Sequence, residues 1–183
     1  MGSNRKSDAE KWNAKYTSRS GDLRDPDLFL SGNLSSLIRG SVLDVACGDG
    51  RNSILLASRG FAVTGADISA VALSRLQRFA RTKGVDIATE EIDLENPAEN
   101  CTVMLGCFQN IVMINYKPIA ALWETLPGLL TKGGILLYCT FNTRHHEKHG
   151  FPRRFCLEPG VYKTPPPSLR LLKYEEVDEP AQN

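Results

Sequence analysis

The sequence lacks an apolar run of the roughly 18 residues that a membrane-spanning helix requires. It begins MGSNRKS, without the apolar stretch of a secretory signal. It also lacks any C-x-x-C pair, and its five cysteines are odd in number and scattered. Such spacing is typical of reduced thiols rather than of disulfides or a zinc site. We therefore expect a cytoplasmic protein that does not contact membranes.

An excess of charge of one sign is also missing. The chain has 22 lysines and arginines against 21 acidic residues, a net charge of +1. This balance provides no general attraction to nucleic acid, and we expect no nucleic-acid partner. The only histidines lie in RHHEKHG, residues 144–150. An H-E-x-x-H zinc motif would need one more residue before the last histidine, so we predict no metal and a basic surface loop.

What the sequence contains is an alternation of strand-like and helix-like runs from residue 42 onward. The 183 residues, 42% of them hydrophobic, suit one domain with a real core. Alternation of this kind predicts βαβ units and a mostly parallel sheet. The helix at 69–84 has Ser69 as its N-cap and Gly84 at its end, and the helix at 119–130 is broken near Pro127. The predicted strands are 42–46, 61–67, 85–92, 108–114, 134–141 and 169–176.

The stretch VLDVACGDGRNS, residues 42–53, places two glycines directly after the first strand. Glycine packs poorly and costs backbone entropy, so this turn indicates that a ligand approaches the main chain closely. Asp67 ends the second strand seventeen residues after Gly50. An acid there can accept hydrogen bonds from both hydroxyls of a ribose. The turn and the acid predict a nucleoside-bearing cofactor, and both NAD and S-adenosylmethionine fit them.

Three further features favour S-adenosylmethionine. Ser53 stands where the dinucleotide fingerprint has its third glycine. Asp44 lies inside the first strand, where an acid can meet the α-ammonium of a methionine moiety, a group that NAD lacks. The motif IDLEN, residues 92–96, follows the third strand and provides an acid for the adenine amino group.

The motifs VLDVACGDGRNS, GADIS, IDLEN, INY and LLTKGGILLY resemble, in order and spacing, those of class I S-adenosylmethionine-dependent methyltransferases. WNAKY, residues 12–16, and GDGRNS look like the small bacterial group of tellurite-resistance methyltransferases. The resemblance covers residues 12–176. It implies a Rossmann-like, doubly wound α/β fold with helices on both faces of a mostly parallel sheet. The family's sheet ends in a hairpin of sixth and seventh strands, and this sequence has no room for the seventh. Either the sequence is truncated, or the sheet is reduced and a partner covers its open edge.

The resemblance also implies a domain division and a set of site residues. Residues 1–40 would form an N-terminal helical lid, and residues 41–183 the domain that binds S-adenosylmethionine. Asn115 and Tyr116 would line the transferring methyl group, although a strand-end Asn-Tyr also fits a turn with a packed ring. Many family members have a third glycine at the position of Ala46. The implied cofactor-binding residues are Asp44, Ala46, Gly48, Gly50, Arg51, Asp67, Ile68, Asp93, Leu94 and Tyr16.

We expect transfer of a methyl group to a small-molecule acceptor by in-line displacement. Besides the three histidines, the sequence shows no obvious general base that could deprotonate the acceptor. This favours an acceptor atom that reacts without losing a proton. The alternative is a non-catalytic S-adenosylmethionine-binding subunit that works with a protein partner. An NAD-linked oxidoreductase fits the glycine turn but not Asp44, Ser53 or IDLEN. The strand at 169–176 would be an open sheet edge, so a homodimer or a protein partner is expected there.

Overall fold

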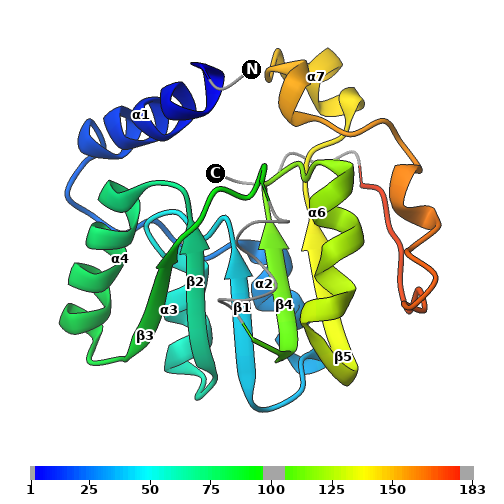
Figure 1. Cartoon of the computed structure of the whole chain (residues 1–183), viewed down its shortest axis with the longest axis horizontal. Helices are drawn as coiled ribbons and strands as arrows, with labels where there is room; N and C mark the ends of the chain where they lie inside the picture. Colours follow the sequence, from blue (N-terminus) through cyan, green and yellow to red (C-terminus); the bar gives the residue numbers. More distant parts are fainter. Residues whose placement is uncertain (1–2, 97–105, 178–183) are drawn as a thin grey trace.

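The computed structural model describes residues 3–96 and 106–177 of the chain (Figure 1). Its centre is a five-stranded sheet in the order β3-β2-β1-β4-β5, and every neighbouring pair is parallel. The strand order reverses between β1 and β4, so the chain winds in both directions from β1. The strands are β1 Ser41–Val45, β2 Ala62–Asp67, β3 Ile87–Glu91, β4 Phe108–Ile114 and β5 Leu130–Cys139.

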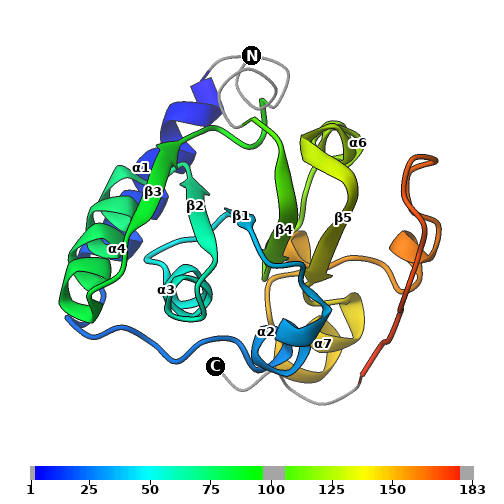
Figure 2. The same cartoon turned by 90° about the horizontal axis from the view of Figure 1, so that it is seen from below.

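Helices cover both faces of this sheet. Seen from below, α3 and α6 lie on opposite sides of the strands (Figure 2). The predicted doubly wound α/β fold is therefore confirmed. The α-helices are α1 Ser3–Thr17, α2 Leu28–Asn33, α3 Arg51–Ser58, α4 Ala70–Lys83, α6 Ala120–Thr125 and α7 Thr143–His149. The 3-10 helices are η1 Leu34–Ser36, η2 Leu126–Leu129, η3 Arg153–Phe155 and η4 Val161–Lys163.

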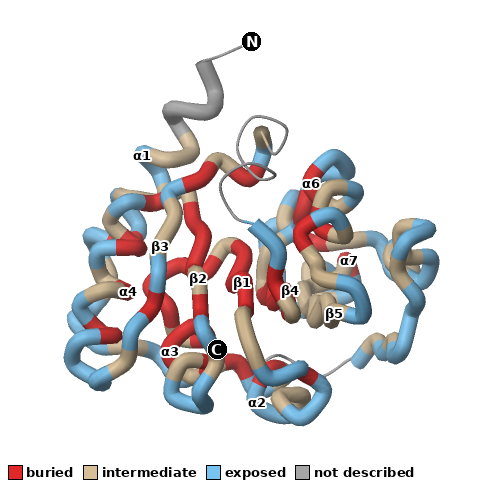
Figure 3. The backbone as a smooth tube through the Cα atoms, turned by 60° about the horizontal axis from the view of Figure 1, so that its bottom comes forward, coloured by how far each residue is buried: buried red, intermediate tan, exposed pale blue. Residues whose placement is uncertain are grey.

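The side chains of β1 alternate between two hydrophobic cores. Val42 packs into the core that contains residues of α2, α3 and α4, whereas Leu43 and Val45 pack into the core under α6. Strands covered on both faces are expected to be almost continuously apolar, as β1 and β4 are. The central strands are accordingly the most buried part of the chain (Figure 3). This rigid centre fixes where the carboxyl ends of the strands lie.

Two predicted helix signals are confirmed. The Ser69 hydroxyl oxygen accepts a hydrogen bond from the backbone N–H of Ala72 at 3.1 Å, and α4 ends at Gly84 with φ +66°. The helix after β4 changes from α6 into the 3-10 helix η2, which contains Pro127. Proline cannot donate a backbone hydrogen bond, so the α-helix gives way there.

The predicted sixth strand at 169–176 is wrong. Within the described residues, this segment pairs with no strand of the sheet. Two of its three leucines are exposed to solvent, Leu171 at 43% and Leu172 at 65%. The segment is held by local polar contacts instead: the Tyr174 hydroxyl donates to Glu176, and it accepts from the backbone N–H of Gly160 at 3.1 Å. Within the described residues, the outer edge of the sheet is therefore β5.

The predicted loop at 144–150 is also wrong, because these residues form helix α7. The side chain of Asn142 caps the helix by accepting from the Arg144 backbone N–H at 3.1 Å, and Gly150 ends it at φ +69°. A cap and a terminal glycine suffice for a short helix. Helices α1 and α7 both lie beyond the carboxyl ends of the strands (Figure 1).

No helix within residues 3–96 and 106–177 is long and apolar enough to cross a membrane.

Candidate functional site

The turn between β1 and α3 is built from left-handed backbone conformations. Ala46, Gly48 and Gly50 have φ values of 56°, 57° and 87°. Glycine adopts this region freely, whereas an alanine there costs about 1 kcal/mol. A Cβ on Gly50 would overlap the side chain of Leu76 in α4. The turn therefore needs Gly50 for packing and carries strain at Ala46, the position at which the sequence departs from the family pattern.

Asp67, at the end of β2, ties the turn to the start of α4. One carboxylate oxygen accepts from the Gly48 backbone N–H at 2.8 Å, and the other accepts from the Ser69 N–H at 2.9 Å. Burial raises the pKa of this carboxyl, although both backbone bonds oppose the change. Asp67 thus lies against the glycine turn, where the sequence places the ribose acid.

Asp44 lies in the middle of the same site and is almost completely buried. It is 1% exposed, and its carboxylate accepts a hydrogen bond from the Ser53 hydroxyl at 2.5 Å. Burial raises the pKa of Asp44 to about 7, and the nearby Asp67 contributes in the same direction. Two buried acids close to each other favour a cationic ligand, because a cation would offset their desolvation and mutual repulsion. Ser53 is thus a site residue in its own right, a role that the sequence analysis missed.

Asp27, which the sequence analysis did not select, joins two residues that it did. Its Oδ2 accepts from the Arg51 Nη2 at 3.1 Å and from the Asn115 Nδ2 at 3.3 Å. Its other oxygen caps α2 by accepting from the Phe29 backbone N–H. Asn115 itself has φ +59°, and its backbone N–H donates to the Cys139 carbonyl at 2.8 Å. The sequence signal for Asp27 was its residue type, a common N-cap, directly before the apolar run of residues 28–30.

Helix α1 covers the glycine turn. The Tyr16 hydroxyl occupies the space that a Cβ on Gly48 would need. Burial, together with the charge of Asp67, raises the pKa of Tyr16 above its ordinary value. One turn earlier, the Asn13 Oδ1 accepts from the Ser69 hydroxyl at 2.7 Å. Tyr16 therefore lies against the glycine turn, and its role in closing the pocket stays a prediction.

A second missed acid, Asp49, anchors the segment that follows α1. It is 3% exposed, and its two oxygens pair with Arg19 Nη1 at 3.1 Å and with Arg75 Nη2 at 3.2 Å. Arg75 also donates to the Ser20 carbonyl, and the Arg19 guanidinium lies 4.5 Å from the centre of the Tyr16 ring. The aspartate between the two glycines was the signal that could have identified this anchor.

The remaining predicted site residues differ in their burial and in the groups that they contact. Ile68 is half-buried directly after Asp67. Asp93 is half-buried and accepts from the Glu95 backbone N–H at 2.9 Å, which leaves its other oxygen for a ligand. The side chain of Leu94 belongs to the core under α6, and Tyr116 packs against that core, as does Ala46 of the glycine turn. The roles of Leu94 and Tyr116 at the site stay predictions.

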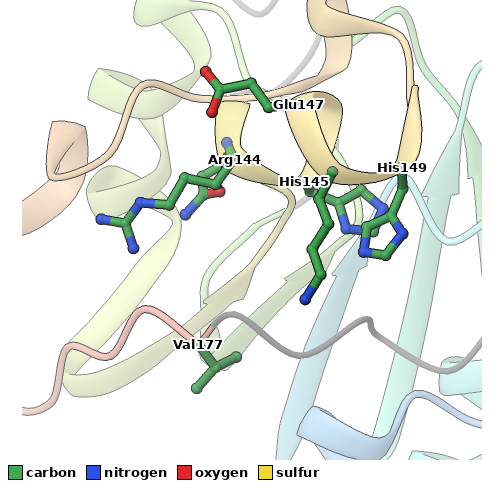
Figure 4. A pocket seen from close by; sticks show the side chains of 7 residues that line it. Arg144, His145, Glu147, His149 and Val177 are labelled. Carbon is green, nitrogen blue, oxygen red and sulfur yellow. Dashed lines mark hydrogen bonds between the residues drawn. The ribbon is translucent and has the colours of Figure 1, made fainter.

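A hollow of about 460 Å³ lies beside α7 (Figure 4). The His145 and His149 rings lie side by side there, 4.6 Å apart, and His145 stacks on Phe141 at 4.5 Å. Burial and the neighbouring His149 lower the pKa of His145. The described residues contain no group of three or more metal-ligating side chains that could hold an ion. The hollow is lined by Asn142, Arg144, His145, Glu147, Lys148, His149 and Val177.

The arrangement at the glycine turn suits a ligand that combines an ammonium group, hydroxyls and a carboxylate. Asp44 would be the buried acid for the ammonium, Asp67 would accept hydrogen bonds from the hydroxyls, and Arg51 would be the cation for the carboxylate. S-adenosylmethionine carries all three groups. The residues present therefore fit this cofactor.

Comparison with known proteins agrees with this fit. Residues 42–134, just over half of the chain, match the family model described as a methyltransferase domain. The chain is 32% identical over 111 residues to a ubiquinone biosynthesis O-methyltransferase of Nitrosococcus oceani; the match covers 60% of this chain and 47% of that protein. The chain thus spans about half the length of this curated relative.

Solved structures share the fold. A structure described as "Conversion of a Disulfide Bond into a Thioacetal Group during Echinomycin Biosynthesis" has a TM-score of 0.61 at 22% identity, with 76% of this chain and 64% of that one covered. An S-adenosylmethionine-dependent methyltransferase of Clostridium acetobutylicum has a TM-score of 0.52 at 17% identity, with 76% and 53% covered. Both likenesses concern the fold alone.

The match of the family model spans β1, the glycine turn, Asp67 and Asn115, the same elements from which the site is built. The expected cofactor, S-adenosylmethionine, is thereby confirmed at the level of the family. The chain belongs to the methyltransferase domain family.

Proposed function

We propose that this chain transfers a methyl group from S-adenosylmethionine to a small-molecule acceptor. The observation that carries the proposal is the pair of buried acids, Asp44 and Asp67, on either side of the glycine turn. Asp44 would hold the ammonium of the methionine end, and Asp67 the ribose hydroxyls. Ile68 and the residues around Asp93 and Leu94 would enclose the adenine.

When bound, S-adenosylmethionine supplies an electrophilic methyl group on a positively charged sulfur. The chain's own contribution is orientation, which can supply roughly 7–11 kcal/mol in well-arranged cases. Asn115, held by Asp27 and by the Cys139 carbonyl, is fixed at the carboxyl end of β4 for this purpose. The acceptor atom would attack the methyl in line with the sulfur, and the bonding electrons would leave with the sulfur.

Exclusion of water would come from α1 and the segment that follows α7. The Trp12 and Phe155 rings meet at 6.5 Å between centroids, which joins the two segments. Separation from bulk water strengthens electrostatic interactions inside a site. This contact supports residues 1–40 as a lid on the domain of residues 41–183.

The histidines of α7 would serve an acceptor that must lose a proton. Burial and the charge of His149 lower the pKa of His145, which favours the neutral imidazole, the form that can accept a proton. In contrast, the His146 Nδ1 is 2.7 Å from the Phe151 carbonyl oxygen and is engaged there. His145 is therefore our candidate base for an oxygen or nitrogen acceptor, and a soft or anionic acceptor would need none.

A small-molecule acceptor is supported by the name of the ubiquinone biosynthesis relative. The tellurite-resistance-like group remains our narrower proposal and rests on WNAKY and GDGRNS. A cytoplasmic location and the absence of nucleic-acid and membrane partners likewise remain proposals from composition.

The test is release of S-adenosylhomocysteine over a panel of small phenols, thiols, amines, halides and tellurite. Turnover with at least one of them, abolished in Asp44→Ala, is the expected result. Tight S-adenosylhomocysteine binding without turnover on any of them would count against a small-molecule enzyme.

The second candidate is a non-catalytic binding subunit, and the open edge of β5 favours it. Within the described residues β5 pairs only with β4, and an unpaired strand edge tends to recruit another chain. We propose that a homodimer or a protein partner covers this edge. Light scattering at increasing protein concentration tests the homodimer. A molar mass that rises to twice that of one chain would support the dimer. A constant monomer mass together with full turnover would rule the dimer out.

A further inference from the structure

Asp27 connects the two halves of the proposed site. It stands at the start of α2, Arg51 is the first residue of α3, and Asn115 follows β4. The three side chains meet at one carboxylate oxygen of Asp27, with distances of 3.1 Å to Arg51 and 3.3 Å to Asn115. They come from separate elements, so the meeting is a product of the fold rather than of local sequence.

The contacts are sheltered from solvent, which makes them directional. Asp27 is 6% exposed, and the Arg51 side chain is 18% exposed. The backbone of Asp27 is fixed as well, because its N–H donates to the Asn52 Oδ1 at 2.9 Å. A charge-assisted pair in such surroundings holds its partners in place better than a surface pair does.

Arg51 also acts on a second acid. Its positive charge lowers the pKa of Asp44, opposing the effect of burial, while its guanidinium bonds Asp27. Without the Asp27 charge, the guanidinium would be drawn toward Asp44, the acid that the ammonium of the cofactor needs.

We propose that Asp27 is a positioning residue, which keeps Arg51 off Asp44 and directed at the carboxylate of the cofactor while it orients Asn115. This inference rests on the proposed function. It assigns Asp27 no contact with the methyl group; Asp27 acts through Arg51 and Asn115. The single carboxylate thereby links cofactor binding to the residue at the methyl-transfer end.

The test compares two ligands by calorimetry. S-adenosylhomocysteine carries the amino-acid carboxylate and ammonium, whereas 5′-methylthioadenosine has the same nucleoside without them. Asp27→Asn keeps an oxygen that can cap α2 and removes the charge. We expect it to weaken S-adenosylhomocysteine binding by about tenfold and to change 5′-methylthioadenosine binding by less than about twofold. Asp25→Asn, an exposed acid on the same segment, is the matched control and should change neither.

Two further measurements separate positioning from simple structural support. Arg51→Gln should lose as much S-adenosylhomocysteine affinity as Asp27→Asn, and the double variant should lose no more than Arg51→Gln alone. In the ligand-free protein, a carbon-13 titration of the Asp44 carboxyl should shift to lower pH in Asp27→Asn, because Arg51 moves closer. Ser53 and Asp67, the other groups at Asp44, are unchanged in this variant.

The outcomes are distinguishable. Equal losses for both ligands, or additive losses in the double variant, would overturn the positioning role and leave the cofactor assignment intact. An unchanged Asp44 titration together with unchanged S-adenosylhomocysteine affinity would overturn it as well. A wild-type protein that binds neither ligand would overturn the proposed function, and this inference with it.

Discussion

The Tyr16 hydroxyl lies directly over Gly48, in the space that a β-carbon at that position would fill. A residue of the N-terminal helix is thus fitted against the main chain of the glycine turn, and the Asp67 carboxylate accepts a hydrogen bond from the backbone N–H of the same glycine. Because α1 and the turn pack against each other, changes in either should affect the proposed cofactor site.

Gly48→Ala should displace α1 and weaken S-adenosylhomocysteine binding at least tenfold, because the new methyl group would overlap Tyr16. The backbone at φ +57° adds a strain of about 1–2 kcal/mol. Gly84→Ala is the matched control, since it has φ +66° and open space around it. It should lower stability similarly and leave affinity unchanged. Equal affinities for the two variants would show that Tyr16 does not seat on the turn.

Asp49→Asn should loosen α1 by weakening the contacts to Arg19 and Arg75. Weakening a partly buried charge pair of this kind should cost about 2–3 kcal/mol. Hydrogen exchange of residues 8–17 should speed up, while β1 and β4 stay protected. Asp8→Asn is the control, because its pair with Lys11 is exposed and contributes little. Identical exchange in the two variants would contradict an anchoring role for Asp49.

The raised pKa of Asp44 predicts a pH dependence of cofactor binding. The ammonium requires the ionised carboxylate, and at a pKa of about 7 much of the carboxyl is protonated near neutrality. S-adenosylhomocysteine affinity should therefore fall by about tenfold between pH 8 and pH 6, with a proton released on binding. Calorimetry in two buffers of different ionisation heat measures that proton. Affinity independent of pH across this range would remove Asp44 as the ammonium acid.

The same carboxyl predicts how stability changes with pH. The folded chain holds the Asp44 proton more tightly than the unfolded chain, in which the pKa is about 3.9. Its contribution to stability is thus fully present below about pH 4 and is lost as pH rises to about 7. Asp44→Asn should lose less stability across that window than the wild type. Parallel unfolding curves for the two proteins would contradict the raised pKa.

Asp67→Ala should weaken S-adenosylhomocysteine binding by about 1–3 kcal/mol. The hydrogen bonds that Asp67 accepts from Gly48 and Ser69 indicate that stability should fall too. Asp93→Ala, an acid with a single local backbone bond, is the comparison for thermal unfolding. Loss of stability with unchanged affinity would make Asp67 purely structural.

Local patterns explain what could be predicted from the sequence. The strand–turn–helix alternation, the ends of α4 and the positions of Asp44, Gly48 and Asp67 depend on short spacings within the chain. The Asp27–Asn115 contact could not be predicted from local patterns, because the two residues are 88 positions apart in the sequence. The prediction of a strand at 169–176 was wrong for a related reason. The leucines of this segment show that it is apolar, but they do not show whether a neighbouring strand is available to pair with it.

The most direct test of the central claim is calorimetric titration of the unmodified chain with S-adenosylhomocysteine and, separately, with NAD. The account predicts saturable, one-to-one binding of S-adenosylhomocysteine and no heat with NAD, because Asp44 requires an ammonium group that NAD does not have. Saturable NAD binding without any response to S-adenosylhomocysteine would contradict it.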